Sequence, residues 1–236
     1  NGLLKMLQSI DKKKKIFIYL TLLILLGTQI SKNHDIEKKN LIKANHIEVF
    51  GLSEKNNMKI TNRLKPFLFK NIFFLKKNFF YEILEENNLI ESFYIQKIYP
   101  NRIKVNIEKT SFLALTSKDN KRFYIGANGK LISMNNSESF KKKLPFVFTK
   151  NNYNDFIDLK KTIDKSNFQF NEINSFYHFP SNRWDLKTKD GTLIKLPEKN
   201  ILNALQLIYK IKSNQKIGDN KIIDLRISNH IITSNE

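Results

Sequence analysis

Apolar residues are distributed in two ways along this chain: one short apolar run near its start, and many short alternating patterns after residue 46. The run extends from Ile16 to Leu26, and Thr21 is its only clearly polar residue. The core helix of a soluble domain would carry a polar stripe at 3.6-residue spacing, which this run lacks. The pattern therefore predicts a helix with apolar surroundings on every side, ending no later than Ile30.

Lysines flank this predicted helix on its N-terminal side, where Lys12 to Lys15 stand together. Positively charged flanks stay cytoplasmic. We therefore expect residues 1–15 inside the cell, residues 16–30 as a single-pass type II transmembrane anchor in the inner membrane, and the bulk of the chain in the periplasm. A helix of this length covers about 22 Å, against roughly 30 Å of hydrocarbon. Snorkelling lysines would cover the shortfall.

A cleaved secretory signal is the alternative that the short apolar run favours. Cleavage of a signal peptide requires small side chains at defined positions after the apolar run. The bulky Gln29 occupies one of these positions. We therefore predict an uncleaved anchor. Residues 31–45 are polar and mixed in charge, and they predict a linker between the anchor and the first folded module.

Residues 46–111 predict a small α+β module, because stretches with strand periodicity enclose two stretches with helix periodicity. Pro66 stops the first helix or begins the next turn. The expected elements are a strand with Ile47 and Val49 that Gly51 closes, a helix from Glu54 capped by Ser53 with Ile60 and Leu64 inward, a helix from Lys76 to Asn87 with Phe79, Phe80, Ile83 and Leu84 inward, a strand from Ile90 to Tyr99, a turn at Pro100-Asn101, and a strand with Ile103, Val105 and Ile107 inward.

Residues 112–236 predict a mostly antiparallel β-domain with two helices. Asn128-Gly129 and Asp190-Gly191 are its hairpin signals, since both central residues of a type I′ turn need positive φ. The helices are expected from Asn154 or Asp155, with Phe156, Leu159 and Ile163 inward, and after Pro197, with Ile201, Leu202, Leu205, Ile208 and Tyr209 inward; terminal strands are expected over Ile222 to Ile227 and His230 to Ile232.

The charge balance raises the question of an anionic partner. The 236 residues hold 41 Lys plus Arg against 22 Asp plus Glu, a formal net charge of +19. Such a balance is typical of proteins that bind nucleic acid or anionic membranes. An AT-rich coding sequence would also enrich Lys together with Asn, Ile and Phe. We expect no nucleic-acid partner, because an exported domain does not meet chromosomal DNA.

Candidate chemistry is sparse. The chain has no cysteine, which excludes disulfides, thiolate zinc sites and iron–sulfur clusters. No glycine-rich phosphate loop or nucleophile elbow is present, and the histidines lack metal-ligand spacing. We therefore predict a protein without enzyme activity, cofactor, metal or small-molecule substrate. The histidines are His34, His46, His178 and His230.

Short motifs follow one another in order from the lysine cluster to about Asn229. They occupy residues 47–51, 71–75, 95–108, 124–129, 144–145, 183–186, 191–197 and 224–226. This series resembles the FtsQ/DivIB family of bacterial cell-division proteins, and residues 46–111 resemble its POTRA module. Residues 112–236 would then form the β-domain of that family.

The resemblance implies a bitopic scaffold of the divisome that binds FtsB- and FtsL-type proteins in the periplasm. The FtsB-type partner would add a strand beside the last strands of the β-domain, and the POTRA module would contact further division proteins. A membrane-tethered basic module that binds anionic wall polymer or lipid headgroups is the alternative. Salt separates the two, because binding through exposed lysines weakens as ionic strength rises.

The partner-binding residues are expected at the C-terminal strand, because no later segment of length remains to cover it and its edge stays unpaired. Arginine is rare in the chain, yet Arg102, Arg183 and Arg226 lie in the motifs, which suggests either a planar fork for a partner or local ion pairs. Trp184 is either a core aromatic or a partner contact. The predicted partner-binding residues are Arg183, Trp184, Arg226, Ile227, Ser228, Asn229 and His230.

Overall fold

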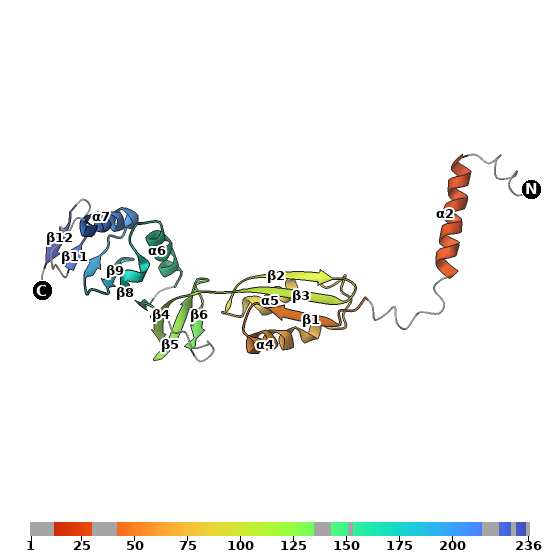
Figure 1. Cartoon of the computed structure of the whole chain (residues 1–236), viewed down its shortest axis with the longest axis horizontal. Helices are drawn as coiled ribbons and strands as arrows, with labels where there is room; N and C mark the ends of the chain where they lie inside the picture. Colours follow the sequence, from red (N-terminus) through yellow and green to blue (C-terminus); the bar gives the residue numbers. More distant parts are fainter. Residues whose placement is uncertain are drawn as a thin grey trace, which may run out of the picture. The chain divides into compact units, whose positions relative to one another are not determined.

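The computed structural model describes residues 12–29, 42–134, 143–150, 153–213, 222–227 and 230–234. The chain forms two compact units: Asn1–Tyr81 with Ile95–Asn106, and Glu82–Tyr94 with Ile107–Glu236 (Figure 1). Helices and strands are present in both, which confirms the predicted α+β class.

The N-terminal helix α2 (Lys12–Gln29) starts at the lysine cluster, four residues before the apolar run. Its apolar side chains from Ile16 to Leu26 are exposed around the helix, apart from the partly covered Ile18. Within the described parts of the chain, no helix combines the length and the apolar character needed to cross a membrane. Ile30, the end of the predicted anchor, lies outside the described residues.

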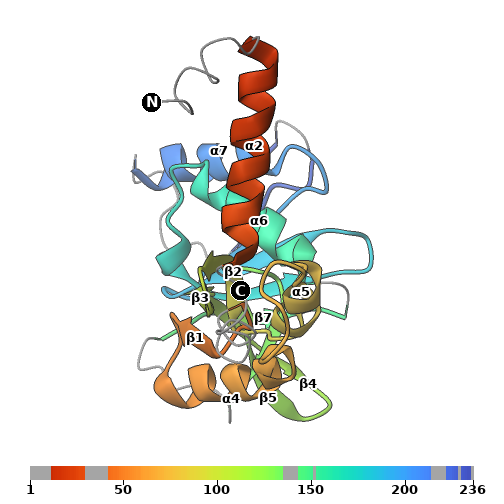
Figure 2. The same ribbon diagram turned by 90° about the vertical axis from the view of Figure 1, so that its right-hand side faces the viewer.

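The first unit is built on a three-stranded sheet with the order β1-β3-β2. The register of the parallel β1–β3 pair sets Val49 opposite Val105, both buried, and α4 packs against β1 through Ile60 and Leu64 (Figures 1 and 2). The elements are β1 (His46–Phe50), α4 (Glu54–Leu64), η1 (Lys65–Phe67), α5 (Asn78–Glu85), β2 (Ile90–Ile98) and β3 (Arg102–Lys109).

Most of the predicted elements of this region are confirmed, including the burial of Ile103, Val105 and Ile107. The second helix is shorter than predicted: α5 covers Asn78–Glu85 rather than 76–87. Phe79, expected inward, is about half exposed, because the buried side of α5 is occupied by Phe80 and Leu84.

The second unit contains a nine-stranded sheet with the order β12-β11-β10-β9-β8-β7-β4-β5-β6. Five of its strand pairs are antiparallel and three are parallel, so the prediction of a mostly antiparallel sheet holds. Its elements are β4 (Phe112–Lys118), β5 (Lys121–Gly126), β6 (Leu131–Ser133), β7 (Phe146–Phe148), α6 (Asn154–Asp164), η3 (Phe170–Glu172), β8 (Ile173–His178), β9 (Trp184–Thr188), β10 (Leu193–Lys195), α7 (Ile201–Ser213), β11 (Ile222–Asp224) and β12 (Ile232–Ser234).

The core of this unit lies between the sheet and the helices α6 and α7. The buried side chains that form it include Phe156, Leu159 and Ile163 from α6, as predicted, and Leu205 and Ile208 from α7. Tyr209, expected to face inward, is nearly half exposed. It follows Ile208 by one residue, and adjacent helix positions point in directions about 100° apart, so burial of Ile208 turns Tyr209 outward.

The two glycine-containing hairpin signals do connect antiparallel strands, β5 with β6 and β9 with β10. Their predicted type I′ geometry is wrong, because one of the two central residues in each turn has positive φ, Gly129 in the first and Gly191 in the second. Both central residues have positive φ in the β4–β5 connection instead, at Asp119 (φ 50°) and Asn120 (φ 58°). Asp and Asn tolerate this region better than other non-glycine residues, so a turn of this kind can form without glycine.

The predicted C-terminal strands are shorter and shifted. β11 ends at Asp224 rather than at Ile227, and β12 begins at Ile232 rather than at His230. The backbone N–H of Arg226 donates to the side chain of Asp224 at 3.0 Å, a local contact that turns the chain out of the strand.

Side-chain amides explain why residues 82–94 belong to the second unit. Asn128 donates to the carbonyl of Ile90 at 2.9 Å and to that of Asn88 at 3.1 Å. Asn88 in turn donates to the carbonyl of Leu131 at 2.7 Å. These bonds attach the start of β2 to the β5–β6 hairpin. The boundary between the two units therefore falls within β2 and within β3. The predicted boundary between residues 111 and 112 stays a prediction.

Candidate functional site

The candidate site is the edge of the large sheet formed by β12. This strand pairs with β11 on one side, and β12 and β6 are the two outermost strands of the described sheet. All three residues of β12 are exposed, and Ile232 shows 50% of its surface. An outermost strand carries backbone N–H and C=O groups that point away from the sheet and can pair with another strand.

A row of apolar side chains crosses the sheet towards this edge on the side of the helices. It runs in register through Val147, Phe176, Leu186, Ile194 and Ile223, and each of these residues is fully buried. The next position in register is on β12, where Thr233 is exposed. The buried apolar row therefore ends at β11, and the matching position on the edge strand is accessible to a further strand.

The opposite face of the sheet carries charges at the same edge. In register, Asp185 of β9 faces Lys195 of β10, Lys195 faces Asp224 of β11, and Asp224 faces Ile232 of β12. Alternating charges on neighbouring strands attract one another. Two of the predicted site residues, Arg183 and Arg226, extend this charged row.

Arg226 is bound to Asp224. Its Nε donates to both carboxylate oxygens, at 2.8 Å to Oδ1 and 2.9 Å to Oδ2, and a terminal guanidinium nitrogen also contacts Oδ2. This hydrogen bonding lowers the pKa of Asp224, and the carboxylate raises the pKa of Arg226. The arginine fork suggested by the sequence is present, and in this structure it binds a carboxylate of its own chain.

Arg183 forms a weaker pair with Asp185. Its Nε lies 3.4 Å from Oδ1, and both atoms are buried with no hydrogen-bond partner among the described residues. The guanidinium also lies over the ring of Phe179, 4.6 Å from its centroid. Burial raises the pKa of Asp185, although the positive charge of Arg183 opposes this shift. The third motif arginine, Arg102, is exposed at the start of β3 in the first unit.

Trp184 belongs to the core of the second unit. Its surface is 3% exposed, and its ring stacks on His178 with a centroid distance of 4.3 Å. Phe176 packs edge-on against it at 6.4 Å. Burial agrees with the core interpretation of the sequence, while a role of Trp184 in partner binding stays a prediction.

Ile227 and His230 lie between β11 and β12 and are both exposed. They line a small hollow of about 140 Å³ with residues that precede or belong to α7, among them Asn203 and Leu207. The structure thus brings Ile227 and His230 together at this hollow, while the guanidinium of Arg226 is bound to Asp224. Ser228 and Asn229 lie outside the described residues.

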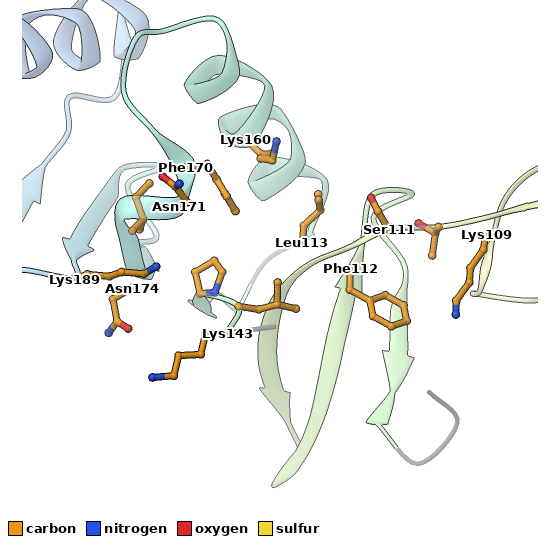
Figure 3. Close-up of a pocket in the computed structure, with 14 residues that line it drawn as sticks. Lys109, Ser111, Phe112, Leu113, Lys143, Lys160, Phe170, Asn171, Asn174 and Lys189 are labelled. Atoms are coloured by element: carbon orange, nitrogen blue, oxygen red, sulfur yellow. The ribbon is translucent and has the colours of Figure 1, made fainter. Parts of the chain in front are cut away.

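A larger hollow of about 770 Å³ lies within the second unit (Figure 3). β7 is shorter than its neighbours and pairs with β4 only at Leu115, so the beginnings of β4 and β8 extend past it. Among the described residues, the lining contains four lysines, which are Lys109, Lys143, Lys160 and Lys189, and no acidic side chain. Sequence analysis missed this hollow because its walls come from five separate segments.

Among the residues that the structure describes, no group of three or more His, Asp or Glu side chains is placed to hold a metal ion.

Comparison with known proteins gives one consistent family. The model of "Cell division protein FtsQ/DivIB, C-terminal" matches residues 114–226. The cell division protein FtsQ of Rickettsia bellii is 29% identical over 180 residues, which cover 75% of this chain and 66% of that protein. FtsQ of Rhizobium radiobacter is 23% identical over 141 residues, covering 59% of this chain and 67% of that protein. FtsQ of Agrobacterium fabrum shows the same identity, with 44% of its length covered. The chain therefore spans between about half and two thirds of these relatives.

Among solved structures, the extracytoplasmic domain of DivIB from Geobacillus stearothermophilus is similar at a TM-score of 0.34 and 10% identity, covering 47% of this chain and 98% of that domain. The family match is the more informative result, because residues 114–226 begin in β4 and include every element up to β11 and the Asp224–Arg226 pair. Residues 114–226 of this chain belong to the FtsQ/DivIB family of cell-division proteins.

Proposed function

We propose that this protein is a non-catalytic scaffold of the bacterial divisome, which binds an FtsB-type partner by strand addition at β12 and acts together with an FtsL-type protein. The observation that carries the proposal is the outermost position of β12, where the buried apolar row ends at an exposed Thr233. Strand addition needs an accessible row of backbone donors and acceptors, together with side-chain contacts for specificity.

Charge and shape around β12 support the same proposal. The charged row of Asp185, Lys195 and Asp224 reaches β12 at Ile232, and the apolar row reaches it at Thr233, so an added strand would meet Ile232 on one face and Thr233 on the other. Alternate side chains of an extended partner point to opposite faces. The hollow beside Ile227 and His230 would receive a side chain from the end of the partner segment.

The proposal includes attachment to the inner membrane through α2, with the two folded units in the periplasm. Its support is the lysine cluster at the start of the helix and the exposed apolar side chains that follow it. Lysines favour the cytoplasmic side of a membrane. Their long side chains can reach the headgroups from a helix that is shorter than the hydrocarbon layer.

Binding of an anionic wall polymer is the second candidate function. The observation that favours it is the hollow lined by Lys109, Lys143, Lys160 and Lys189, whose described lining holds no acidic side chain. Four ammonium groups around one hollow attract negative charge. Lys160 also pairs with Asp164 at 2.5 Å, so part of this positive charge is already compensated.

Titration of salt separates the two functions. The full chain in detergent or nanodiscs is mixed with a labelled FtsB-type partner, and separately with purified wall polymer, between 50 and 500 mM salt. We expect partner affinity to change less than about threefold, because strand pairing and apolar contacts are weakly screened. Loss of partner affinity by more than tenfold over this range, together with tight polymer binding at low salt, would instead support the polymer-binding function.

A further inference from the structure

Four phenylalanines are exposed on one short segment of the first unit, residues 69–79, which we call the phenylalanine loop. Phe69, Phe73, Phe74 and Phe79 show 70%, 59%, 80% and 47% of their surfaces. Single exposed apolar residues are common on proteins, whereas a group of large ones marks an interaction surface. Strand addition at β12 does not explain why these four phenylalanines are exposed.

The exposure is imposed by the fold. Ile72, Leu75 and Phe80 of the same region are buried, and they fix the segment to the core of the first unit. Phe73 stacks on Tyr99 at a centroid distance of 4.8 Å, and Tyr99 is itself more than half exposed. A loop held by buried neighbours cannot turn its remaining phenylalanines inward.

The backbone at Phe69 supports this conclusion. Phe69 has φ of 62°, in the left-handed region that a bulky residue rarely occupies. Its N–H donates to the carbonyl of Ala44 at 2.8 Å, which holds the residue in place. The fold therefore accepts an unfavourable backbone conformation at a residue whose side chain points into solvent.

The charge of the loop is uniformly positive. Residues 69–79 contain Lys70, Lys76 and Lys77 and no acidic residue. Lys97, from β2, also reaches the loop and donates to the carbonyl of Phe73 at 3.3 Å. Aromatic side chains combined with lysines are the composition of surfaces that enter the interface of an anionic bilayer.

The position of the loop along the chain indicates which surface it meets. Residues 42–44 hold the loop through backbone hydrogen bonds from Ile72 to Ile42 at 2.9 Å and from Ala44 to Lys70 at 2.9 Å. Only residues 30–41 separate Ile42 from the end of α2 at Gln29. Even fully extended, this stretch spans at most about 45 Å. A membrane-embedded α2 therefore leaves the loop within reach of the bilayer.

We infer that the phenylalanine loop docks on the outer surface of the inner membrane, with Phe69, Phe73, Phe74 and Phe79 at the boundary between headgroups and acyl chains and the lysines on anionic headgroups. The inference rests on the proposed attachment through α2. It assigns to the first unit a lipid contact that would fix its orientation relative to the membrane.

The absence of cysteine allows a site-specific test in the full chain. Phe74→Cys carries a polarity-sensitive fluorophore within the loop, and Met58→Cys carries it at a control position on α4 of the same unit, where Met58 is 60% exposed. Each labelled chain is reconstituted into vesicles of phosphatidylcholine with about 30% phosphatidylglycerol, with and without a lipid that bears a nitroxide at carbon 5. Flotation measures attachment of the chain.

We expect a blue shift and at least twofold nitroxide quenching at position 74, and neither at position 58. In the Phe74→Cys chain, addition of Phe69→Ser and Lys76→Gln should abolish both signals while the chain still floats. Flotation with an unshifted probe at position 74 would overturn the inference alone. A blue shift without nitroxide quenching would also overturn it, since the loop would then contact protein. Failure to float would overturn both the attachment through α2 and the inference.

Discussion

The guanidinium of Arg226 contacts both carboxylate oxygens of Asp224, two residues earlier in the chain, while Asp224 stands opposite Ile232 of the edge strand. The sequence offered two roles for this arginine, a fork for a partner or a local ion pair. The structure contains the local pair. A partner carboxylate at the edge would therefore compete with Asp224 or share the guanidinium with it.

Charge reversal at Arg226 tests which of these occurs. We expect Arg226→Glu to weaken FtsB-type binding by about 1.5 to 3 kcal/mol, because a charge-assisted contact is lost, while the fold stays intact. Calorimetry on the folded variant measures the change. Asp224→Asn is the matched control: equal losses in both variants would show that the pair acts by shaping the β11–β12 connection, whereas a loss confined to Arg226→Glu would show direct contact.

The same pair predicts an acid response. Because Arg226 lowers the pKa of Asp224 below its ordinary value of 3.8, the folded protein holds the carboxylate ionised where the unfolded chain already binds a proton. The stabilisation is complete above the unfolded pKa and is lost as pH falls through the lower folded pKa. A carbon-13 titration of the Asp224 carboxyl should show the lowered pKa, and Arg226→Gln should return it towards 3.8. An unchanged pKa in Arg226→Gln would contradict the pairing.

The contribution of Asp185 to stability should change with pH in the opposite direction. Burial raises its pKa above 3.8, so the folded protein keeps the proton where the unfolded chain has lost it. Stability from this group is therefore highest below pH 3.8 and decreases as pH rises through the folded pKa. Chemical denaturation should show Asp185→Asn gaining stability relative to the parent protein as pH rises from below 3.8 to above it. A constant difference over this range would mean that Arg183 compensates the burial fully.

The buried position of Trp184 allows its two interpretations, a core aromatic and a partner contact, to be tested. We expect Trp184→Ala to lower the free energy of unfolding by about 3–5 kcal/mol, as truncation of a large buried aromatic residue does. Trp184→Phe should keep more of that stability and full partner affinity. Because it is the only tryptophan in the chain, its fluorescence reports on it alone. A shift in its emission on addition of the partner would contradict a role confined to the core.

Local sequence patterns predicted a strand correctly where the alternation of apolar residues matches their burial. The alternation at Ile103, Val105 and Ile107 predicted a buried strand face correctly, because strand periodicity and burial agree there. The hairpin turns were harder. Glycine marked Gly129 and Gly191, but the turn with two positive φ angles uses Asp119 and Asn120, for which no glycine gives a signal.

Strand periodicity shows neither side-chain hydrogen bonds to the backbone nor pairing between distant strands, and both shape the C-terminal part of the sheet. Ile222 to Ile227 looks like one strand, yet the side chain of Asp224 binds the backbone of Arg226 and ends β11 early. The register that carries the apolar row to Thr233 joins strands that are far apart in the sequence. A sheet edge was thus predicted near the C-terminus, but the strand that forms it, residues 232–234, lies two residues further along the chain than the predicted one.

The central claim is that an extended partner pairs with β12, and a comparison of proline variants at the two sheet edges tests it most directly. Proline removes a backbone donor. Thr233→Pro and Ser234→Pro sample both N–H directions of β12, and Ser133→Pro is the control on β6 at the other edge.

Partner affinity is measured by calorimetry on those variants whose denaturation midpoint is unchanged. We predict that the folded β12 variant loses at least tenfold in affinity for the FtsB-type partner, while Ser133→Pro binds like the parent protein. Unchanged affinity in a folded β12 variant whose proline replaces an outward N–H, or a loss confined to Ser133→Pro, would contradict strand addition at β12.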